Sequence, residues 1–137
     1  HEPRVAFVSF SNFGHPMREK ALRVREAVSI LDQQSVEFEY DGEMAANVAL
    51  NSGLLKLYPF CRLSKPANIL IMPALHSSNI SAKLLQEFGG ATLIGPILCG
   101  LAKPVQILQM GATVSDILNS AAIAANHGIL NGDNKYS

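Results

Sequence analysis

Charge is scarce in this sequence, and the two signs are balanced. Only 16% of the 137 residues are charged, with 11 basic residues against 11 acidic ones. The sequence has no cluster of basic residues that could bind along the phosphate backbone of a nucleic acid, so we expect no nucleic-acid partner. Long apolar runs are also missing, because Asn68 and Pro73 interrupt the stretch from Ala67 to Leu75, and a bilayer span needs roughly 20 apolar residues. We expect a soluble, cytoplasmic protein with no membrane partner.

Cysteine is almost absent. Cys61 and Cys99 are the only two, and neither belongs to a CxxC motif or a Cys/His cluster. We therefore predict no metal site, and we expect both thiols to be small buried side chains in a reducing cytoplasm.

Apolar residues make up 48% of the chain, enough for one compact domain. The nearly continuous apolar run Val5–Phe10 predicts a strand that is covered on both faces. The alternating run Val36–Tyr40 predicts a strand with one wet face, which Asp41 and Gly42 should end. Further strands are predicted at Ile69–Met72, Thr92–Gly95 and Val105–Leu108, and helices at Arg18–Asp32, Glu43–Tyr58 with a break at Asn51–Gly53, Ser78–Phe88 and Val114–Ala125.

This alternation predicts an α/β fold with a mainly parallel sheet and helices on both faces, in three layers. The polar end NGDNKYS is expected to fray. Ligands of such sheets bind beyond the carboxyl ends of the strands. The loops of interest are therefore SNFGHP, PALHSSN and QMGAT.

The loop SNFGHP joins a strand to a helix. Its backbone amides, with Ser11 and Asn12, are suited to an anionic ligand, although the same residue types serve ordinary turn geometry. In PALHSSN, His76 stands beside Ser77, but no GxSxG elbow is present and the serines suit a helix N-cap. We assign no nucleophile there.

Carboxylates stand at two further points. Thr113 and Asp116 have the spacing of a capping box, so helix chemistry alone explains Asp116, and a ligand role is the alternative. Asp41 and Glu43 could pair as a general acid and a general base, but roles in a turn and at a helix start explain them more simply.

Five segments, in order over nearly the whole chain, resemble the phosphate acetyltransferase family. They are SFSNFG, DGEMAANVALN, LYPFCRLSKPANILIMPAL, ISAKLLQEFGGATLIGPILCGLAKPV and GATVSDILNSAAIAA. Within the family, SNFG, DGEM and RLSKPANILIMP are most similar to the C-terminal domain of bacterial NADP-dependent malic enzymes.

The resemblance implies an isocitrate/isopropylmalate-dehydrogenase-like fold of two lobes, with residues 1–137 as the C-terminal portion of a phosphotransacetylase-like domain in a longer chain. It also implies acetyl-CoA as ligand and self-association as a homodimer or larger. NADP and a divalent metal are expected only in other domains of such a protein, and no cofactor in this part. The residues expected to bind acetyl-CoA are Ser11, Asn12, Gly14, Gln109, Gly111 and Asp116. Lys83 and Lys103 are further candidates for its phosphates, or else solvated surface lysines.

The sequence departs from the family pattern at one place. Active transferases carry a Ser-Arg pair just before the glycine that matches Gly111, and an Asp five residues after it, matching Asp116. Here Gln109 and Met110 stand in place of the pair. A cavity that lacks this cation is expected to bind acetyl-CoA without transferring its acetyl group, because ground-state binding and transition-state stabilisation are separable. We therefore expect no catalytic residue, and a regulatory domain of a malic enzyme. The alternative is part of an active phosphate acetyltransferase.

Overall fold

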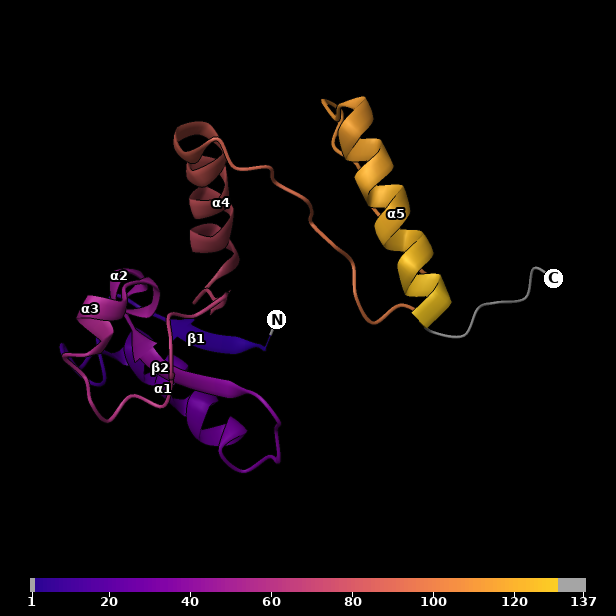
Figure 1. Cartoon of the computed structure of the whole chain (residues 1–137). Coiled ribbons are helices and arrows are strands. Elements are labelled where there is room, and N and C mark those ends of the chain that lie inside the picture. Colours follow the sequence, from indigo (N-terminus) through magenta and orange to yellow (C-terminus); the bar gives the residue numbers. More distant parts are fainter. Residues whose placement is uncertain (1, 131–137) are drawn as a thin grey trace. The chain divides into compact units, whose positions relative to one another are not determined.

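The computed structural model describes residues 2–130, which excludes the NGDNKYS end. Residues 1–81 and 82–137 form separate compact units. The first contains β1 (Arg4–Val8), α1 (Glu19–Leu31), β2 (Glu39–Met44), α2 (Ala46–Leu50), α3 (Ser52–Leu55) and β3 (Ile69–Ile71) (Figure 1). Helix α4 (Leu75–Gly89) crosses the boundary between the units, and α5 (Val114–Leu130) belongs to the second.

A three-stranded parallel sheet with the order β2-β1-β3 organises the first unit. Strand β1 lies in the centre, which explains why its side chains are apolar on both faces and why Val5, Ala6 and Val8 are buried. Helix α1 packs against β2 and β1, and α2 packs against β1. The α/β class with a parallel sheet is therefore confirmed.

The buried core also lies in the first unit. Its members are Ala6, Val8, Met44, Val48, Ala49, Leu55, Leu63 and Ala67. Cys61 packs against this core, and burial raises the pKa of its thiol to about 11. Cys99 is exposed, so the expectation of two buried thiols is wrong for this residue.

The region around β2 differs from the expectation. Asp41 and Gly42 do not end the strand, which begins at Glu39 and continues to Met44. Pairing with β1 outweighs the turn preference of Asp-Gly. Glycine allows this because Gly42 adopts φ 155°, a backbone conformation that other residues disfavour. The Asp41 carboxylate also accepts hydrogen bonds from the amides of Gly42 (2.8 Å) and Arg62 (2.7 Å). Glu43 is consequently in a strand and does not start a helix.

The helix expected over Glu43–Tyr58 is two short helices, α2 and α3. The predicted break is confirmed, and its cause is Asn51, whose side chain accepts hydrogen bonds from the amides of Gly53 and Leu54 and so caps α3. Helix α4 begins at Leu75, earlier than expected, so Ser77 and Ser78 lie inside it and are not its N-cap. Helix α5 extends past the predicted end at Ala125 to Leu130.

Two predicted strands, Thr92–Gly95 and Val105–Leu108, are not formed. Within residues 2–130 this region has only an isolated bridge between Ile97 and Gln106. Apolar residues alone do not make a strand, since the backbone needs a neighbouring strand for its hydrogen bonds, and the described chain provides none here.

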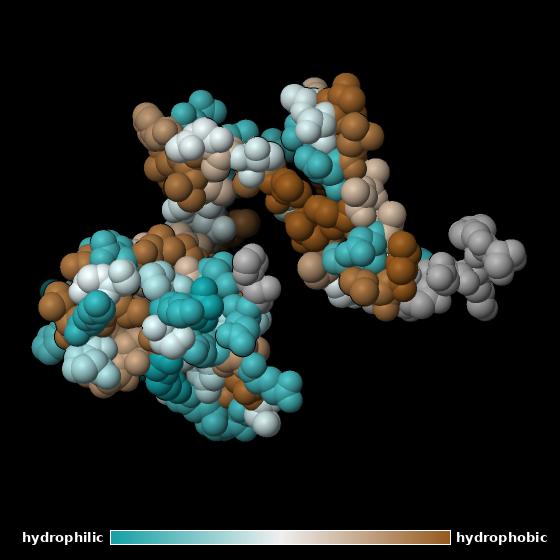
Figure 2. Space-filling model, viewed as in Figure 1, coloured by the Kyte–Doolittle hydropathy of each residue, from teal (hydrophilic) through white to brown (hydrophobic). Residues whose placement is uncertain are grey.

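The second unit has apolar sequence without a buried core. No residue from 68 to 130 is buried. Large apolar side chains such as Phe88 of α4 and Leu118 of α5 are exposed, and apolar residues colour the surfaces of these helices brown in Figure 2. No helix among residues 2–130 is both long and apolar enough to span a membrane.

Candidate functional site

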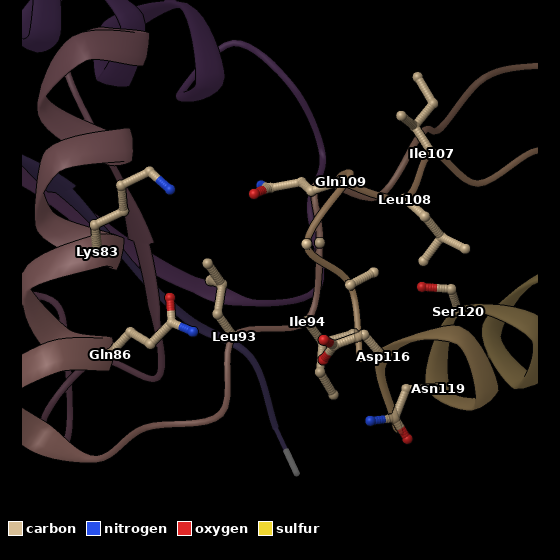
Figure 3. Close-up of a pocket in the computed structure, with 13 residues that line it drawn as sticks. Lys83, Gln86, Leu93, Ile94, Ile107, Leu108, Gln109, Asp116, Asn119 and Ser120 are labelled. Carbon is tan, nitrogen blue, oxygen red and sulfur yellow. The ribbon is translucent and has the colours of Figure 1, made fainter. Parts of the chain in front are cut away.

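A cavity of about 170 Å³ lies within the second unit. Helix α4, two irregular segments and the first turns of α5 form its walls (Figure 3). It is lined by Lys83, Gln86, Leu93, Ile94, Gly95, Ile107, Leu108, Gln109, Gly111, Ala112, Asp116, Asn119 and Ser120. Three of the predicted ligand residues, Gln109, Gly111 and Asp116, therefore share one cavity, although their role in binding stays a prediction.

The start of α5 sets the shape of one wall, and the predicted capping box is confirmed there. The backbone amide and hydroxyl of Thr113 each donate to Asp116 Oδ2 at 2.8 Å. In return, the Asp116 amide donates to Thr113 Oγ1 at 3.2 Å. The hydrogen bond from the Thr113 amide, followed by that from its hydroxyl, lowers the pKa of the Asp116 carboxyl. The carboxylate is thus ionised at neutral pH and committed to the helix start.

This cap has a testable pH dependence. Because the folded-state pKa of Asp116 is depressed, its stabilising effect is complete above the ordinary value of 3.8 and is lost as the pH falls through the lower folded value. In an NMR titration of the chain, we expect the Asp116 carboxyl to titrate with a midpoint below 3.8. Replacing Thr113 with alanine should raise that midpoint, and an unchanged midpoint in this variant would contradict the assignment.

The other predicted ligand residues, Ser11, Asn12 and Gly14, lie in the first unit. The Ser11 side chain is fully buried and donates to Glu43 Oε1 at 3.0 Å. The Gly14 amide donates to the same oxygen at 2.7 Å, and Asn12 Oδ1 accepts from the Ala45 amide at 2.7 Å. These groups hold the loop to the end of β2. Their role toward a ligand stays a prediction.

Glu43 is the centre of this loop, which the sequence did not indicate. It is 1% exposed, and its second oxygen accepts from Arg25 Nε of α1 at 3.2 Å. Asp41 bonds instead to Arg62, so each carboxylate has its own cationic partner, and the idea of an acid–base pair gains no support. No local pattern separates Arg25 from the neighbouring arginines of its helix, because the contact spans 18 positions in sequence.

Metal ligation has no geometric basis in the described part of the chain. Across residues 2–130, no three His, Cys, Asp or Glu side chains gather in a way that would hold an ion.

Comparison with known proteins identifies the family. Residues 1–125 match the model of the phosphate acetyl/butaryl transferase family. The chain belongs to this family.

The relatives include malic enzymes and phosphate acetyltransferases. The NADP-dependent malic enzyme of Rhizobium meliloti (strain 1021) is 63% identical over 123 residues, which cover 90% of this chain but 16% of that protein. The phosphate acetyltransferase of Paracoccus denitrificans is 38% identical over 125 residues, 90% of this chain and 39% of that protein. A solved phosphotransacetylase from Streptococcus pyogenes has a TM-score of 0.87 at 34% identity and covers 94% of this chain and 40% of its own. This member of the transferase family thus spans only a minor part of the relatives that it matches.

The departure from the transferase pattern has a clear structural form. Gln109 lines the cavity with an uncharged amide, whereas Met110 is fully exposed and is not among the lining residues. The expectation of a cavity without a cation is wrong, however, because Lys83 of α4 also lines it. Figure 3 shows the Lys83 ammonium and the Gln109 amide directed toward each other across the cavity. The sequence offered Lys83 as a candidate for the phosphates of acetyl-CoA, but it did not show that Lys83 and Gln109 share a cavity, since 26 positions separate them.

Proposed function

We propose that this chain is a regulatory region of an NADP-dependent malic enzyme that binds acetyl-CoA and does not transfer its acetyl group. The observation that carries the proposal is the position of Gln109, whose side chain lines the cavity. At the place where the family pattern has a Ser-Arg pair, an uncharged amide lines the cavity and Met110 lies outside it. A preorganised donor at a developing negative charge is worth on the order of a hundredfold or more in rate.

Asp116, which matches an Asp that active transferases also carry, is compatible with the same function. Its carboxylate accepts hydrogen bonds from Thr113 and completes the start of α5. Both these bonds favour the ionised form and lower its pKa, so the group is poorly suited to hold and release a proton near neutral pH. Gly111 and Ala112, which precede α5, still line the cavity, although the Ser-Arg pair of active transferases is replaced by Gln109 and Met110.

The close malic-enzyme relative suggests the role of the whole protein. It would oxidatively decarboxylate malate to pyruvate in the cytoplasm, with NADP and a divalent metal bound in regions outside this chain. Acetyl-CoA would act as an effector on a self-associated enzyme, a homodimer or larger. Such coupling requires that the ligand bind two states of the assembly with different affinities.

Part of an active phosphate acetyltransferase is the second candidate, and Lys83 favours it. An ammonium at the cavity wall offers the positive charge that Met110 lacks. A lysine is a flexible point charge, without the planar fork with which arginine binds two oxygens, so we rank this function second.

The deciding experiment uses the full-length natural protein. Calorimetry should show heat of acetyl-CoA binding, and malate-dependent NADPH formation should change when acetyl-CoA is added. With acetyl-CoA and phosphate, release of free CoA thiol should show no sustained turnover, while a phosphate acetyltransferase serves as positive control. Sustained turnover would reject the regulatory proposal in favour of the transferase. Absence of binding would reject both the effector and its role.

A further inference from the structure

The first unit has a groove of its own, with a volume of about 260 Å³. All its lining residues come from residues 52–66, the segment that contains α3 and continues toward β3, and none of them lines the cavity of the second unit. Its apolar lining comprises Leu55, Tyr58, Pro59, Cys61, Leu63 and Pro66. Leu55 and Leu63 belong to the buried core, so the core itself supplies part of this apolar surface.

The charge of the groove has one sign. Lys56 and Lys65 are its only charged lining residues, and both are exposed. Among residues 2–130, the ion pairs are those of Arg25 and Arg62, and neither lysine takes part in them. Glu39 attracts Lys65 at longer range, but its carboxylate accepts hydrogen bonds from the amide (2.9 Å) and the hydroxyl (3.0 Å) of Ser64. The groove therefore presents two cations beside an apolar surface, without a carboxylate in its lining.

Hydrogen bonds to the sheet and to α2 hold the lining segment in place. The Arg62 amide donates to Asp41 Oδ2 at 2.7 Å, two positions before Ser64 donates to Glu39. Beyond the groove, the Ala67 amide donates to the carbonyl oxygen of Ala49 at 2.8 Å. A segment that is fixed at these points need not be ordered by a ligand, which lowers the free-energy cost of binding.

The size and chemistry of the groove limit its ligand. Drug-sized ligands occupy pockets of about 300–1,000 Å³, so a groove of about 260 Å³ suits a smaller molecule. The two lysines favour an anion. The apolar lining favours a single carboxylate over a multiply charged group, whose desolvation costs more. Tyr58, Pro59 and Pro66 offer flat ring surfaces, which suit a ligand whose apolar part is also a ring.

We infer that this groove binds a small aromatic carboxylate, with the ring against the apolar lining and the carboxylate oxygens at Lys56 and Lys65. The inference goes beyond the proposed function and does not depend on it, because the two sites share no residue.

Saturation-transfer difference NMR on the full-length natural protein, with benzoate as the probe, tests the inference. The ring protons of benzoate should receive saturation from the protein, and a titration gives the dissociation constant. Because both lysines are exposed, Lys56→Gln and Lys65→Gln should each weaken benzoate binding by about two- to fivefold. The double variant should weaken it by about fourfold to twentyfold. Lys20→Gln, on the exposed surface of α1, is the matched control and should leave the affinity unchanged.

Three further probes separate the ring from the charge. Benzamide has the ring without the charge, and acetate has the charge without the ring, so both should bind more weakly than benzoate. The affinity for benzamide should be the same in the lysine variants and the natural protein. Inorganic phosphate at the concentration of benzoate should not displace it.

Several results would overturn the inference. Benzoate binding that is unchanged in the double variant would belong to another site. Acetate that binds as tightly as benzoate would remove the role of the apolar lining, and displacement by phosphate would show a general anion site. The calorimetric measurement of acetyl-CoA binding tests the proposed function separately, so either conclusion can fail while the other stands.

Discussion

Replacing Gly42 with alanine is expected to destabilise the first unit by about 3 kcal/mol or more, since overpacking and a disfavoured backbone conformation each contribute on the order of 1–3 kcal/mol. A Cβ at this position would lie 2.6 Å from the Phe7 carbonyl oxygen and 2.7 Å from Phe7 Cβ. Both strands are held in register there by the pairing of Phe7 with Gly42. Neither backbone can move away without loss of that pairing.

Urea unfolding followed by tyrosine fluorescence measures this effect. The sequence has no tryptophan, and Tyr40 and Tyr58 are the tyrosines of the first unit. Gly89→Ala, in the second unit, is a control for a glycine replacement that meets no neighbour, because nothing lies within 4 Å of a Cβ there and the residue is helical. We expect the control to be neutral or slightly stabilising. A Gly42→Ala variant as stable as the control would show that the two strands do not approach this closely.

Replacing Glu43 with alanine is the second large change, with an expected loss of about 3 kcal/mol in the free energy of unfolding. The substitution leaves the buried Ser11 hydroxyl and the Gly14 amide without their acceptor. Arg25 is partly exposed, so water can solvate its guanidinium and limit the loss. Glu43→Gln keeps an acceptor but removes the negative charge, and its effect should be smaller.

The same unfolding measurement applies, with Glu37→Ala as control because Glu37 is an exposed acidic residue. The control should change the free energy by less than about 0.5 kcal/mol. A Glu43→Ala protein that unfolds at the urea concentration of the control would contradict the central role of this carboxylate. Increased mobility of the Ser11–Gly14 amides in the variant, measured by hydrogen exchange, would locate the effect in the loop.

The elements that the sequence predicted best are those whose signal is local. The apolar run at β1, the helix over Glu19–Leu31 and the capping box of Thr113 and Asp116 each depend on neighbours within a few positions. The family resemblance extended over enough of the chain to be recognised, and the match over residues 1–125 confirms it.

The elements that it missed depend on distant partners. The Asp-Gly pair of β2 favours a turn by itself, but pairing with β1 draws it into the sheet. The opposite occurs at Thr92–Gly95 and Val105–Leu108, where strand-forming residues find no neighbouring strand in the described chain. A strand forms only where a neighbouring strand supplies hydrogen bonds. Local propensity therefore predicted a turn where a strand forms, and strands where none forms.

The sequence by itself determined the α/β class, the family and the replacement of a Ser-Arg pair by Gln109 and Met110. Only the tertiary structure decided which charges face which groups. It placed Glu43 against Arg25 and put Lys83 on the cavity wall with Gln109. Electrostatic contacts depend on distance in space, and the chain reaches these arrangements through elements that are far apart in sequence.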